Sequence, residues 1–400
     1  MSLQSTPGAE RLHIGFFGCR NAGKSSLVNA VTDQYLSIVS ETKGTTTDPV
    51  MKSMELLPAG PVVIIDTPGL DDDGQLGEKR ISKALETLRR CDLCILVVDG
   101  SVGLQEADRQ ILARFRDLRI PYLIVFNKND LRGFSIPAGI EALSVSAAGG
   151  DGIELLKKKI GELADDCETN RFLLRDLLEP GQNLILVCPI DSSAPKGRLI
   201  LPQQLALREA LDAHAAATVT QVEELEKVLS SLNAPPALVV TDSQAFARVS
   251  EIVPDDIMLT SFSILMARYK GFLGQAVDGA ACLRKLRDGD RVLMAEGCSH
   301  HRQCGDIGTV KLPAWIREFS SSNPVFETVS GREFPEDLSA YRLIVQCGGC
   351  MLTEREVQYR MRCAMDRRVP FTNYGTAIAQ MNGILERALR LFPDIHRMVK

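Results

Sequence analysis

The chain has 400 residues, of which 45% are hydrophobic and 24% are charged, and its formal net charge is −5. A chain of this length and composition is expected to fold into two or three globular domains rather than to stay disordered. The acidic balance provides no general attraction to nucleic acid or to an anionic membrane surface, so we expect neither as a partner.

Eleven cysteines are spread over the chain, and its N-terminal segment has no apolar stretch long enough for a signal peptide. No run of the sequence approaches the roughly 20 apolar residues that a membrane-spanning helix needs. We therefore expect a cytoplasmic protein with reduced thiols, in which clustered cysteines act as ligands or catalysts rather than as disulfides.

The region 12–165 alternates apolar runs with amphipathic stretches. Its predicted strands lie at 13–18, 62–69, 93–100, 122–130 and 142–147. Continuous apolar runs separated by helices are typical of buried parallel strands, so this region predicts an α/β fold.

The segment GCRNAGKS, from Gly18 to Ser25, fits the phosphate-binding loop pattern, and it follows a predicted strand and opens a predicted helix. In such a loop the backbone N–H groups surround the phosphates. Lys24 would contact the β- and γ-phosphate oxygens, and Ser25 would ligate Mg²⁺. The residues expected to bind nucleotide here are Gly18, Asn21, Ala22, Gly23, Lys24, Ser25 and Ser26.

Two further motifs end predicted strands. The motif DTPG at 66–69 would hold the metal through a water at Asp66 and sense the γ-phosphate at Gly69. The motif NKND at 127–130 would contact the base, because the Asp130 carboxylate accepts both guanine N–H donors and adenine offers no matching pair.

Two shorter features complete this pattern. Ser146 and Ala147 would close over the base, and Thr46 in the segment GTTTD at 44–48 is the expected switch threonine and Mg²⁺ ligand. The order of the motifs predicts a site for GTP and GDP. The residues expected to take part in hydrolysis are Lys24, Thr46, Asp66 and Gly69, and those expected near the base are Asn127, Lys128, Asp130, Ser146 and Ala147.

These motifs resemble the TrmE–Era–EngA–septin group of translation-factor-like GTPases over roughly the first 165 residues. In the potassium-activated members of that group, an asparagine in the NAGKS stretch helps to bind a monovalent cation, and Asn21 holds that position here. The resemblance therefore implies activation by K⁺. Leu70 stands where Ras-type enzymes carry the glutamine that orients water, so we expect slow intrinsic hydrolysis.

The rest of the chain predicts two further α/β regions, with the stretch 270–274 between them. In the first, strands are predicted at 183–191, 236–242 and 255–260 and helices at 203–216 and 221–232. In the second, strands at 291–298, 342–350 and 367–375 each run into a turn of small residues and then a helix.

Two short motifs follow the first two strands of the last region, Cys298-x-His300 and Cys347-x-x-Cys350. Thiolates are ligands for Zn²⁺, Cu(I) and iron–sulfur clusters. Ligand-binding residues gather outside the carboxyl ends of parallel strands, so the two motifs can meet in the fold despite their separation in sequence. The sequence therefore predicts a metal or cluster site.

The combination of a GTPase region with these cysteine motifs resembles the HydF family of [FeFe]-hydrogenase maturation GTPases over essentially the whole chain. That family carries C-x-H, a spacer of similar length and H-C-x-x-C behind a GTPase and a dimerisation domain. The resemblance implies an α/β protein with a P-loop GTPase domain (1–170), a small α/β dimerisation domain (171–270) and an α/β cluster-binding domain (271–400). It also implies a [4Fe–4S] cluster on Cys298, Cys347 and Cys350.

One position departs from the family pattern, because Gln346 precedes Cys347 where the family often has histidine. The fourth cluster position is left to His300, to Glu296 or to an exchangeable external ligand, with His301 and Cys304 as further candidates. An open position would suit a protein that receives and passes on a precursor, whereas a structural metal site is closed.

By resemblance, the chain would hydrolyse GTP with Mg²⁺ and K⁺ and act as scaffold and carrier for a transient diiron precursor of the hydrogenase H-cluster. Its partners would be the radical-SAM hydrogenase maturases, the apo-[FeFe]-hydrogenase and a second copy of the chain. Two alternatives stay open: a tRNA-modification or ribosome-assembly GTPase with a structural zinc site, and a redox sensor whose cysteines switch a GTP-dependent interaction.

Several other residues have simpler interpretations. Cys91 and Cys94 abut an apolar strand and are expected to pack in the core. The segment 372–375 also follows a predicted strand, and a place in the same carboxyl-end crevice as the cysteines is the less favoured of its interpretations. Arg387, Arg390 and Arg397 near the C-terminus are expected on a solvated helix face.

Overall fold

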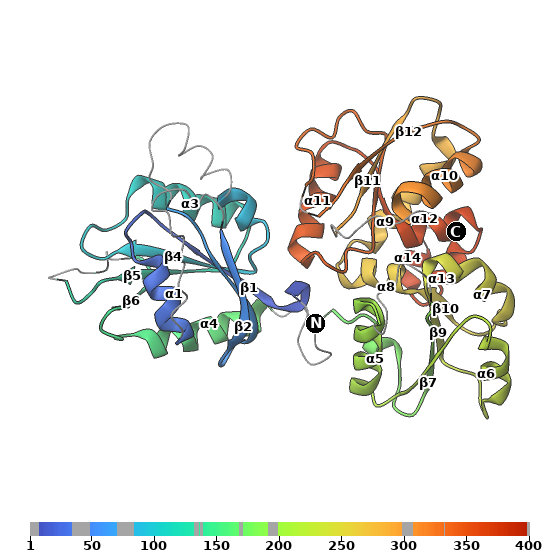
Figure 1. The fold of residues 1–400 in the computed structure, drawn as a ribbon, viewed down its shortest axis with the longest axis horizontal. Coiled ribbons are helices and arrows are strands. Elements are labelled where there is room, and N and C mark those ends of the chain that lie inside the picture. Colours follow the sequence, from blue (N-terminus) through green and yellow to red (C-terminus); the bar gives the residue numbers. More distant parts are fainter. Residues whose placement is uncertain are drawn as a thin grey trace. The chain divides into compact units, whose positions relative to one another are not determined.

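The computed structural model describes residues 8–33, 49–69, 84–131, 136, 139–167, 171–190, 199–297, 307–331 and 333–397. The chain divides into two compact units, Met1–Asn170 and Arg171–Lys400, and each is described by itself (Figure 1). Within the described ranges, no helix combines the length and the apolar character needed to span a bilayer.

The described part of the first unit forms a six-stranded sheet in the order β2-β3-β1-β4-β5-β6. The strands are β1 (Leu12–Phe17), β2 (Val50–Leu56), β3 (Gly60–Asp66), β4 (Leu93–Asp99), β5 (Tyr122–Asn127) and β6 (Ala142–Ser144). All neighbouring pairs are parallel except β2 with β3, which form an antiparallel pair. The central strands β1, β3, β4 and β5 are mostly apolar because both faces of the sheet are covered.

Helices cover both faces of this sheet. They are α1 (Lys24–Thr32), α3 (Glu106–Asp117) and α4 (Ile153–Cys167), with a further helical segment at 84–88. Leu27 of α1 and Leu156 of α4 belong to one core cluster, and Phe115 of α3 belongs to the other. Figure 1 shows α3 on one side of the sheet and α1 with α4 on the other. The carboxyl ends of β1, β3, β4 and β5 therefore meet at one edge, which positions the loops that follow them.

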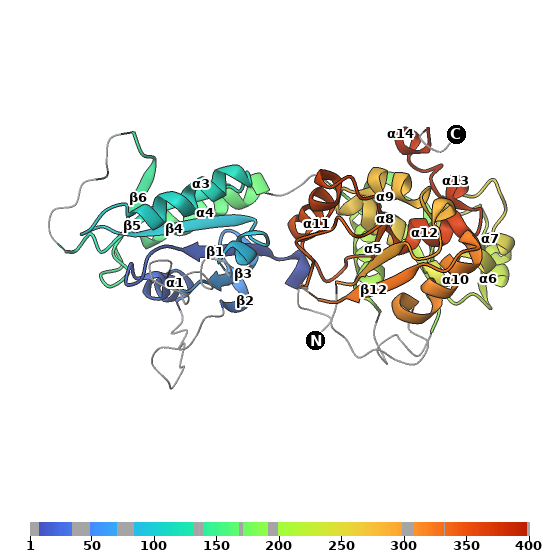
Figure 2. The ribbon, with the colours of Figure 1, turned by 90° about the horizontal axis from the view of Figure 1, so that it is seen from above.

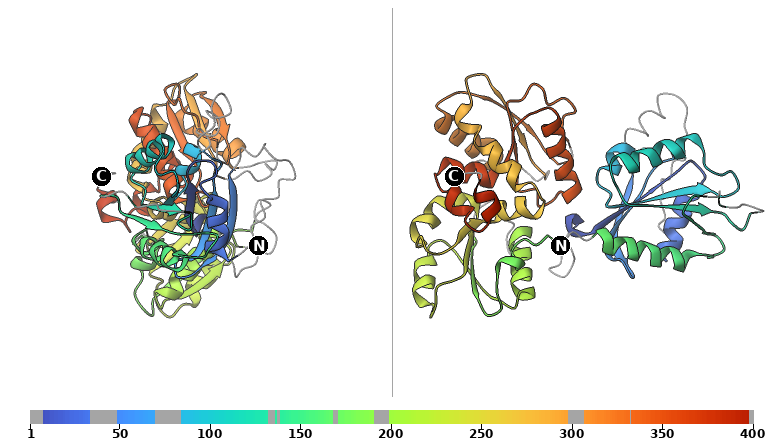
Figure 3. Two further views of the ribbon diagram at one scale, coloured as in Figure 1. Left: turned by 90° about the vertical axis from the view of Figure 1, so that its left-hand side faces the viewer. Right: turned by 180° about the vertical axis from the view of Figure 1, so that it is seen from behind.

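The described part of the second unit contains two four-stranded parallel sheets, in the orders β10-β9-β7-β8 and β12-β11-β13-β14. The first sheet has β7 (Asn183–Val187), β8 (Ala216–Thr220), β9 (Leu238–Thr241) and β10 (Leu259–Ser261). The second has β11 (Arg291–Ala295), β12 (Val325–Val329), β13 (Leu343–Gln346) and β14 (Phe371–Asn373). In Figures 2 and 3 the first sheet is green to yellow and the second orange to red.

Helices join and cover these two sheets. They are α5 (Leu201–Asp212), α6 (Leu225–Ser231), α7 (Phe246–Ile252), α8 (Phe262–Tyr269), α9 (Leu273–Ala280), α10 (Leu312–Ser320), α11 (Glu354–Asp366), α12 (Tyr374–Met381), α13 (Leu385–Ala388) and α14 (Pro393–His396). A π-helix, η5 (Ile307–Lys311), leads into α10. One core cluster contains Leu184 and Val240 from the first sheet and Leu293 and Ile344 from the second, so the two sheets share a core.

The predicted α/β class is confirmed, and so is each strand predicted from an apolar run. The sequence did not predict β2, β8 and β12, which are edge strands with partly exposed residues. The helix predicted at 203–216 was wrong at its end. It stops at Asp212 because His214 takes a left-handed φ of 55°, and Ala216 already begins β8. The division into three domains stays a prediction.

The arginine residues near the C-terminus behave differently from one another. The expectation of a solvated side chain was wrong for Arg387, which is 11% exposed. Its guanidinium donates to the carbonyl oxygens of Ser250, Val253 and Pro254 at 2.9, 2.7 and 2.6 Å, where α7 ends. A cation at a helix C-terminus satisfies carbonyl groups that have no partner within the helix. Arg390 makes one exposed bond, to the Asp255 carbonyl oxygen at 2.9 Å.

Candidate functional site

The loop between β1 and α1 needs glycine at two positions. Gly18 has a φ of 144°, and a Cβ there would lie 2.1 Å from the Val97 carbonyl oxygen. Gly23 has a φ of 86°, and a Cβ would lie 2.3 Å from Nδ2 of Asn127. Other residues at these two positions would be strained and would clash, so the loop conformation depends on both glycines.

Lys24 begins α1 and is 8% exposed. Its Nζ donates to the carbonyl oxygens of Gly18 at 2.9 Å and Cys19 at 2.8 Å, so the ammonium group is held at the centre of the loop. Asn21, with a left-handed φ of 62°, is exposed on the same loop. Ala22 is buried beneath the loop, and Ser26, the third residue of α1, is exposed.

The predicted metal-binding pair lies together in the structure. Ser25 Oγ donates to Oδ2 of Asp66 at 2.6 Å. Burial raises the pKa of Asp66 above its ordinary value, and the Ser25 bond and the Lys24 charge oppose that rise. Thr67 Oγ1 donates to the Phe16 carbonyl oxygen at 2.7 Å, which ties the end of β3 to β1. A serine hydroxyl beside a carboxylate is the donor set with which P-loop enzymes hold Mg²⁺.

The last residue of the DTPG motif, Gly69, lies against the phosphate-binding loop. A Cβ at Gly69 would lie 2.9 Å from Cα of Arg20, so the turn after β3 approaches the loop backbone closely. Thr46 and Leu70 lie outside the described residues.

The predicted base-binding residues also come together, with Asn127 at their centre. Its Nδ2 donates to the Ala22 carbonyl oxygen at 3.0 Å, and its Oδ1 accepts the Ala147 N–H at 3.0 Å. Asn127 is 2% exposed, so it acts as a buried brace between the phosphate-binding loop and the loop after β6. The exposed Asp130 accepts a hydrogen bond from Ser146 Oγ at 2.7 Å.

Sequence reasoning missed Asp99, which contacts the predicted site. Lys128 Nζ lies 2.6 Å from Oδ2 of Asp99, and Ser101 also donates to this carboxylate. Burial acts to raise the pKa of Asp99, but the bonds from Lys128 and Ser101 lower it overall. The ion pair fixes the direction of the Lys128 side chain. The strand register explains this contact, because Asp99 at the end of β4 pairs with Asn127 in β5, the residue before Lys128.

In the second unit, three neighbouring strands end side by side. Ala295 pairs with Gln346, and Gln346 pairs with Asn373. The next residues along the chain, Glu296, Cys347 and Tyr374, therefore lie together at one edge of the sheet. Tyr374 of the segment 372–375 therefore lies at this edge, which is the interpretation that the sequence favoured less.

The Cys347 thiol is surrounded by N–H groups. Among the described residues, its Sγ accepts from Gly297 N at 3.0 Å, Gln346 Nε2 at 3.3 Å and Gly349 N at 3.4 Å. Burial raises the pKa of Cys347, and these donors and the nearby Arg360 charge act in the opposite direction. The pKa of Cys347 is raised overall, so burial outweighs the donors. The donors nevertheless reduce the cost of forming the thiolate, which is the form that binds metals.

Glu296 points toward Tyr374. Its side chain is buried, and Oε1 accepts a hydrogen bond from the Tyr374 hydroxyl at 3.2 Å. A Cβ at Gly308, in the π-helix, would lie 2.1 Å from the same oxygen, so the carboxylate is packed closely against that turn. π-Helical turns are frequent at functional sites.

The other predicted ligands fall into two groups. Cys350 is half-buried and packs against the core. Cys298, His300, His301 and Cys304 lie outside the described residues. Over the described ranges, no three His, Cys, Asp or Glu side chains are grouped so that they could hold a metal ion.

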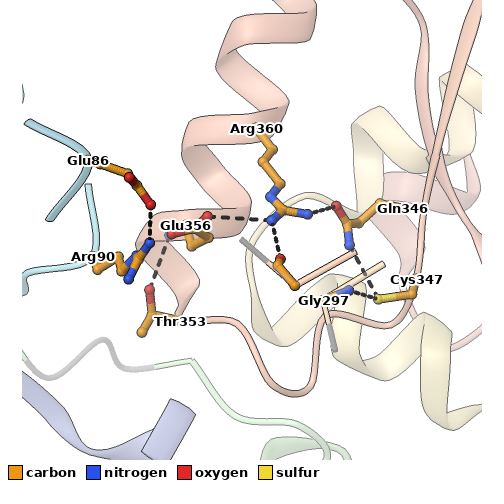
Figure 4. Close-up of polar contacts among 9 residues, drawn as sticks. Glu86, Arg90, Gly297, Gln346, Cys347, Thr353, Glu356 and Arg360 are labelled. Carbon is orange, nitrogen blue, oxygen red and sulfur yellow. Dashed lines mark hydrogen bonds and ion pairs between the residues drawn. The ribbon is translucent and has the colours of Figure 1, made fainter. Parts of the chain in front are cut away.

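A buried polar chain leads away from Cys347 (Figure 4). Gln346 and Arg360 are both 0% exposed. The Arg360 guanidinium donates to Oε1 of Gln346 at 3.3 Å and to the Gly331 carbonyl oxygen at 2.7 Å. It also pairs with Glu356 at 3.5 Å. The sequence signal for this chain of contacts is the spacing of Glu356 and Arg360, four residues apart on one helix.

The two cysteines expected in the core of the first unit are there. Cys91 and Cys94 are 0% exposed, and Cys91 Sγ contacts the Thr87 carbonyl oxygen at 3.3 Å. Their spacing therefore reflects packing around β4.

The phosphate-binding loop, the Ser25–Asp66 pair and the loops after β5 and β6, on a sheet of this topology, define a P-loop GTPase. Three family models match the chain: the 50S ribosome-binding GTPase at residues 13–128, the hydrogen maturase F dimerization domain at 173–271, and the hydrogen maturase F tetramerization domain at 274–391. The two hydrogen maturase F models together cover more than half of the chain. The chain belongs to the hydrogen maturase F (HydF) family of hydrogenase-maturation GTPases.

Curated relatives are similar over part of the chain. The tRNA modification GTPase MnmE of Dechloromonas aromatica (strain RCB) is 36% identical over 158 residues, which cover 38% of this chain and 35% of that protein. MnmE of Legionella pneumophila (strain Paris) is 31% identical over 231 residues, covering 56% and 51%. The chain thus spans between a third and a half of the length of these relatives.

Solved structures match a similar share of this chain but nearly the whole of their own chains. A variant of Aquifex aeolicus Era bound to GDP·AlF4⁻ is 20% identical and covers 52% of this chain and 92% of its own, with a TM-score of 0.33. The G domain of the T. maritima FeoB iron transporter is 26% identical, covers 39% and 99%, and has a TM-score of 0.30.

Proposed function

We propose that this GTPase carries a [4Fe–4S] cluster, and that it assembles and delivers the diiron precursor of the H-cluster to apo-[FeFe]-hydrogenase. The observation that carries the proposal is the Cys347 sulfur, at the carboxyl end of β13, with N–H groups directed at it in a unit that matches HydF models.

For hydrolysis, Ser25, Thr46 and Asp66 would hold Mg²⁺, and the bound ion would neutralise charge that develops on the phosphates. Lys24 would contact the phosphate oxygens from the loop centre. The exposed Asn21 would help to hold K⁺. We propose a slow intrinsic rate, because Leu70 offers no group that orients water.

Cys347, Cys350 and Cys298 would ligate the cluster. The residues fit such a group because Gly297 and Gly349 bring backbone N–H groups onto the Cys347 sulfur, and N–H donors of this kind tune iron–sulfur clusters. The cluster would supply an iron with an exchangeable position.

Glu296 and His300 remain the candidates for that position. Glu296 has a ready alternative partner, since the Tyr374 hydroxyl already holds its carboxylate at 3.2 Å. A ligand with two possible partners would coordinate weakly, which favours exchange at this iron.

The nucleotide state would bias the association with partners rather than drive bond formation at the cluster. The partners would be the radical-SAM maturases and the apo-hydrogenase, met in the cytoplasm by a homodimer or a larger assembly. Nucleotide-independent affinity for the maturases, measured with GDP and with a non-hydrolysable GTP analogue, would contradict this coupling.

The decisive test is anaerobic reconstitution with iron and sulfide, followed by EPR of the reduced protein. We expect a [4Fe–4S] signal that is lost in Cys298→Ser and in Cys350→Ser. Cys363→Ser is the control, because Cys363 is also half-buried but lies on α11. Stoichiometric zinc with no EPR signal would contradict the proposal and support a structural zinc site.

Delivery is tested with Cys350→Ser and Lys24→Ala. Maturation of an apo-hydrogenase should fail with Cys350→Ser, although this variant should still hydrolyse GTP. It should also fall with Lys24→Ala, although that variant should keep its cluster.

A further inference from the structure

The largest fully buried side chain in the described part of the chain is a charged one, Arg360 of α11. Burying a cation costs several kcal/mol unless hydrogen bonds and a partner charge compensate. Arg360 has the Gly331 carbonyl oxygen, the Glu356 carboxylate and the Phe334 ring, whose centroid lies 5.2 Å from Cζ. It also contacts Gln346, which leads to the cysteine site.

The contacts of Gln346 fix the direction of its amide group. A guanidinium has only donors, so the group that faces Arg360 must be the carbonyl oxygen of the amide. The NH₂ end then faces the Cys347 sulfur at 3.3 Å, as Figure 4 shows. Both ends of the amide are thus occupied inside the protein, so Gln346 is not available as a cluster ligand.

We propose that Arg360 and Gln346 form a relay that directs an N–H donor at the Cys347 sulfur and thereby raises the reduction potential of the cluster held there. Both are positioning residues, since neither would touch iron. The inference rests on the proposed function, because it concerns the same cluster.

The physical reason is electrostatic. Reduction adds negative charge to the cluster and its thiolates, and an N–H dipole directed at a ligand sulfur stabilises that added charge. Glu356 neutralises much of the Arg360 charge, so the effect passes mainly through the oriented amide of Gln346. Gln346 stands where the family pattern often has histidine, a potential cluster ligand. Instead of binding iron, the Gln346 amide would donate to the Cys347 sulfur, which is itself a ligand.

The test uses the full-length chain, reconstituted anaerobically with iron and sulfide, and an EPR-monitored redox titration. Gln346→Leu removes the donor, and Gln346→Glu replaces it with an acceptor of similar shape. We expect both to lower the midpoint potential at unchanged cluster content. The expected size for Gln346→Leu is about a tenfold change in the reduction equilibrium, or ~59 mV for a one-electron couple. Gln346→Glu should give a larger shift.

Arg360→Lys keeps the positive charge and loses the planar fork, so it should shift the potential in the same direction by less. Gln358→Leu is the matched control. Gln358 lies on α11 and donates to the Lys270 carbonyl oxygen at 2.6 Å, so the potential of this variant should equal that of the unmodified protein.

Full cluster content with an unchanged potential in both Gln346 variants would overturn the relay and leave the proposed function standing. Loss of the cluster from both Gln346 variants, with circular dichroism showing an intact fold, would also overturn it, because a tuning group is not required for retention. Absence of any cluster from the unmodified protein would overturn the proposed function and the relay together.

Discussion

The candidate nucleotide site and the candidate cluster site both lie at the carboxyl ends of parallel strands, but they are built in different ways. The phosphate-binding part of the first is one contiguous loop, Gly18 to Ser25, whose backbone shape depends on two glycines. The second draws Glu296, Cys347 and Tyr374 from three neighbouring strand ends. Arg360, which contacts Gln346 beside this site, lies on the helix α11.

Because of this difference, we expect different substitutions to impair the two sites. A contiguous loop is encoded by adjacent residues, so changes within the loop should act on nucleotide alone. A site assembled from several strand ends depends on sheet register and helix packing, so distant substitutions in the second unit should reach it. Five experiments test this contrast.

The largest expected effect is on hydrolysis. Lys24→Ala removes the ammonium group from the loop centre, and loss of one donor to a developing phosphate charge costs about 10²–10³-fold in rate. GTP turnover should fall by this amount, while cluster content after reconstitution stays unchanged. Equal losses of both would show that the two sites are not independent.

Cys347→Ser tests whether the cluster can be lost while GTP hydrolysis is retained. A hydroxyl is a poor ligand for iron in a cluster, so the loss of affinity should exceed the roughly 10- to 100-fold that changes around a ligand cause. Iron and sulfide analysis with EPR measures the loss, and GTP turnover should be retained. Cys282→Ser, a buried cysteine on the same unit, is the control.

Asp130→Asn addresses nucleotide selectivity. The Asp130 carboxylate would accept two guanine N–H donors, and a hydrogen bond to a charged group contributes about 1.5–3 kcal/mol. GTP should therefore bind roughly 10- to 100-fold more weakly, and xanthosine triphosphate should bind better than it does to the unmodified chain. Calorimetry with both nucleotides measures the exchange, and unchanged GTP affinity would remove Asp130 from the site.

Arg387→Ala tests whether a substitution away from the candidate cluster site, in the second unit, changes the retention of iron. Losing three carbonyl contacts at the end of α7 should cost about 1–3 kcal/mol in the free energy of unfolding. Arg390→Ala, which loses one exposed bond, should cost within about 0.5 kcal/mol. Urea denaturation gives both values. Faster loss of iron to a chelator is expected only for Arg387→Ala, at an unchanged GTPase rate.

The smallest effect is expected at the exchangeable position. Tyr374→Phe removes the hydroxyl that holds Glu296, a hydrogen bond worth roughly 1 kcal/mol or about fivefold in an equilibrium. Glu296 should then bind iron more tightly, and an added ligand such as imidazole should displace it less readily in EPR titrations. Unchanged imidazole affinity would favour His300 over Glu296.

The fold was predictable where elements are buried. Apolar runs such as those of β4 and β13 identify strands because both faces of their sheets are covered. The edge strands β2, β8 and β12 were not predicted, because their partly exposed residues give no continuous apolar run. The edge strands β10 and β14, whose residues are buried, were predicted. The end of α5 was misplaced since an alanine-rich sequence continues past the left-handed turn at His214.

The amino-acid sequence was sufficient to predict the GTPase class, the nucleotide motifs and the resemblance to the HydF family. These properties depend on short segments whose backbone shape and chemistry are set by adjacent residues, as in the loop before Lys24. The groups that surround Cys347 and Glu296 became visible only in the folded structure. Parallel pairing places strand ends from distant segments side by side, and helix packing directs Arg360 toward Gln346. No local pattern encodes such contacts, because they arise from the register between strands and from the burial of a helix against them.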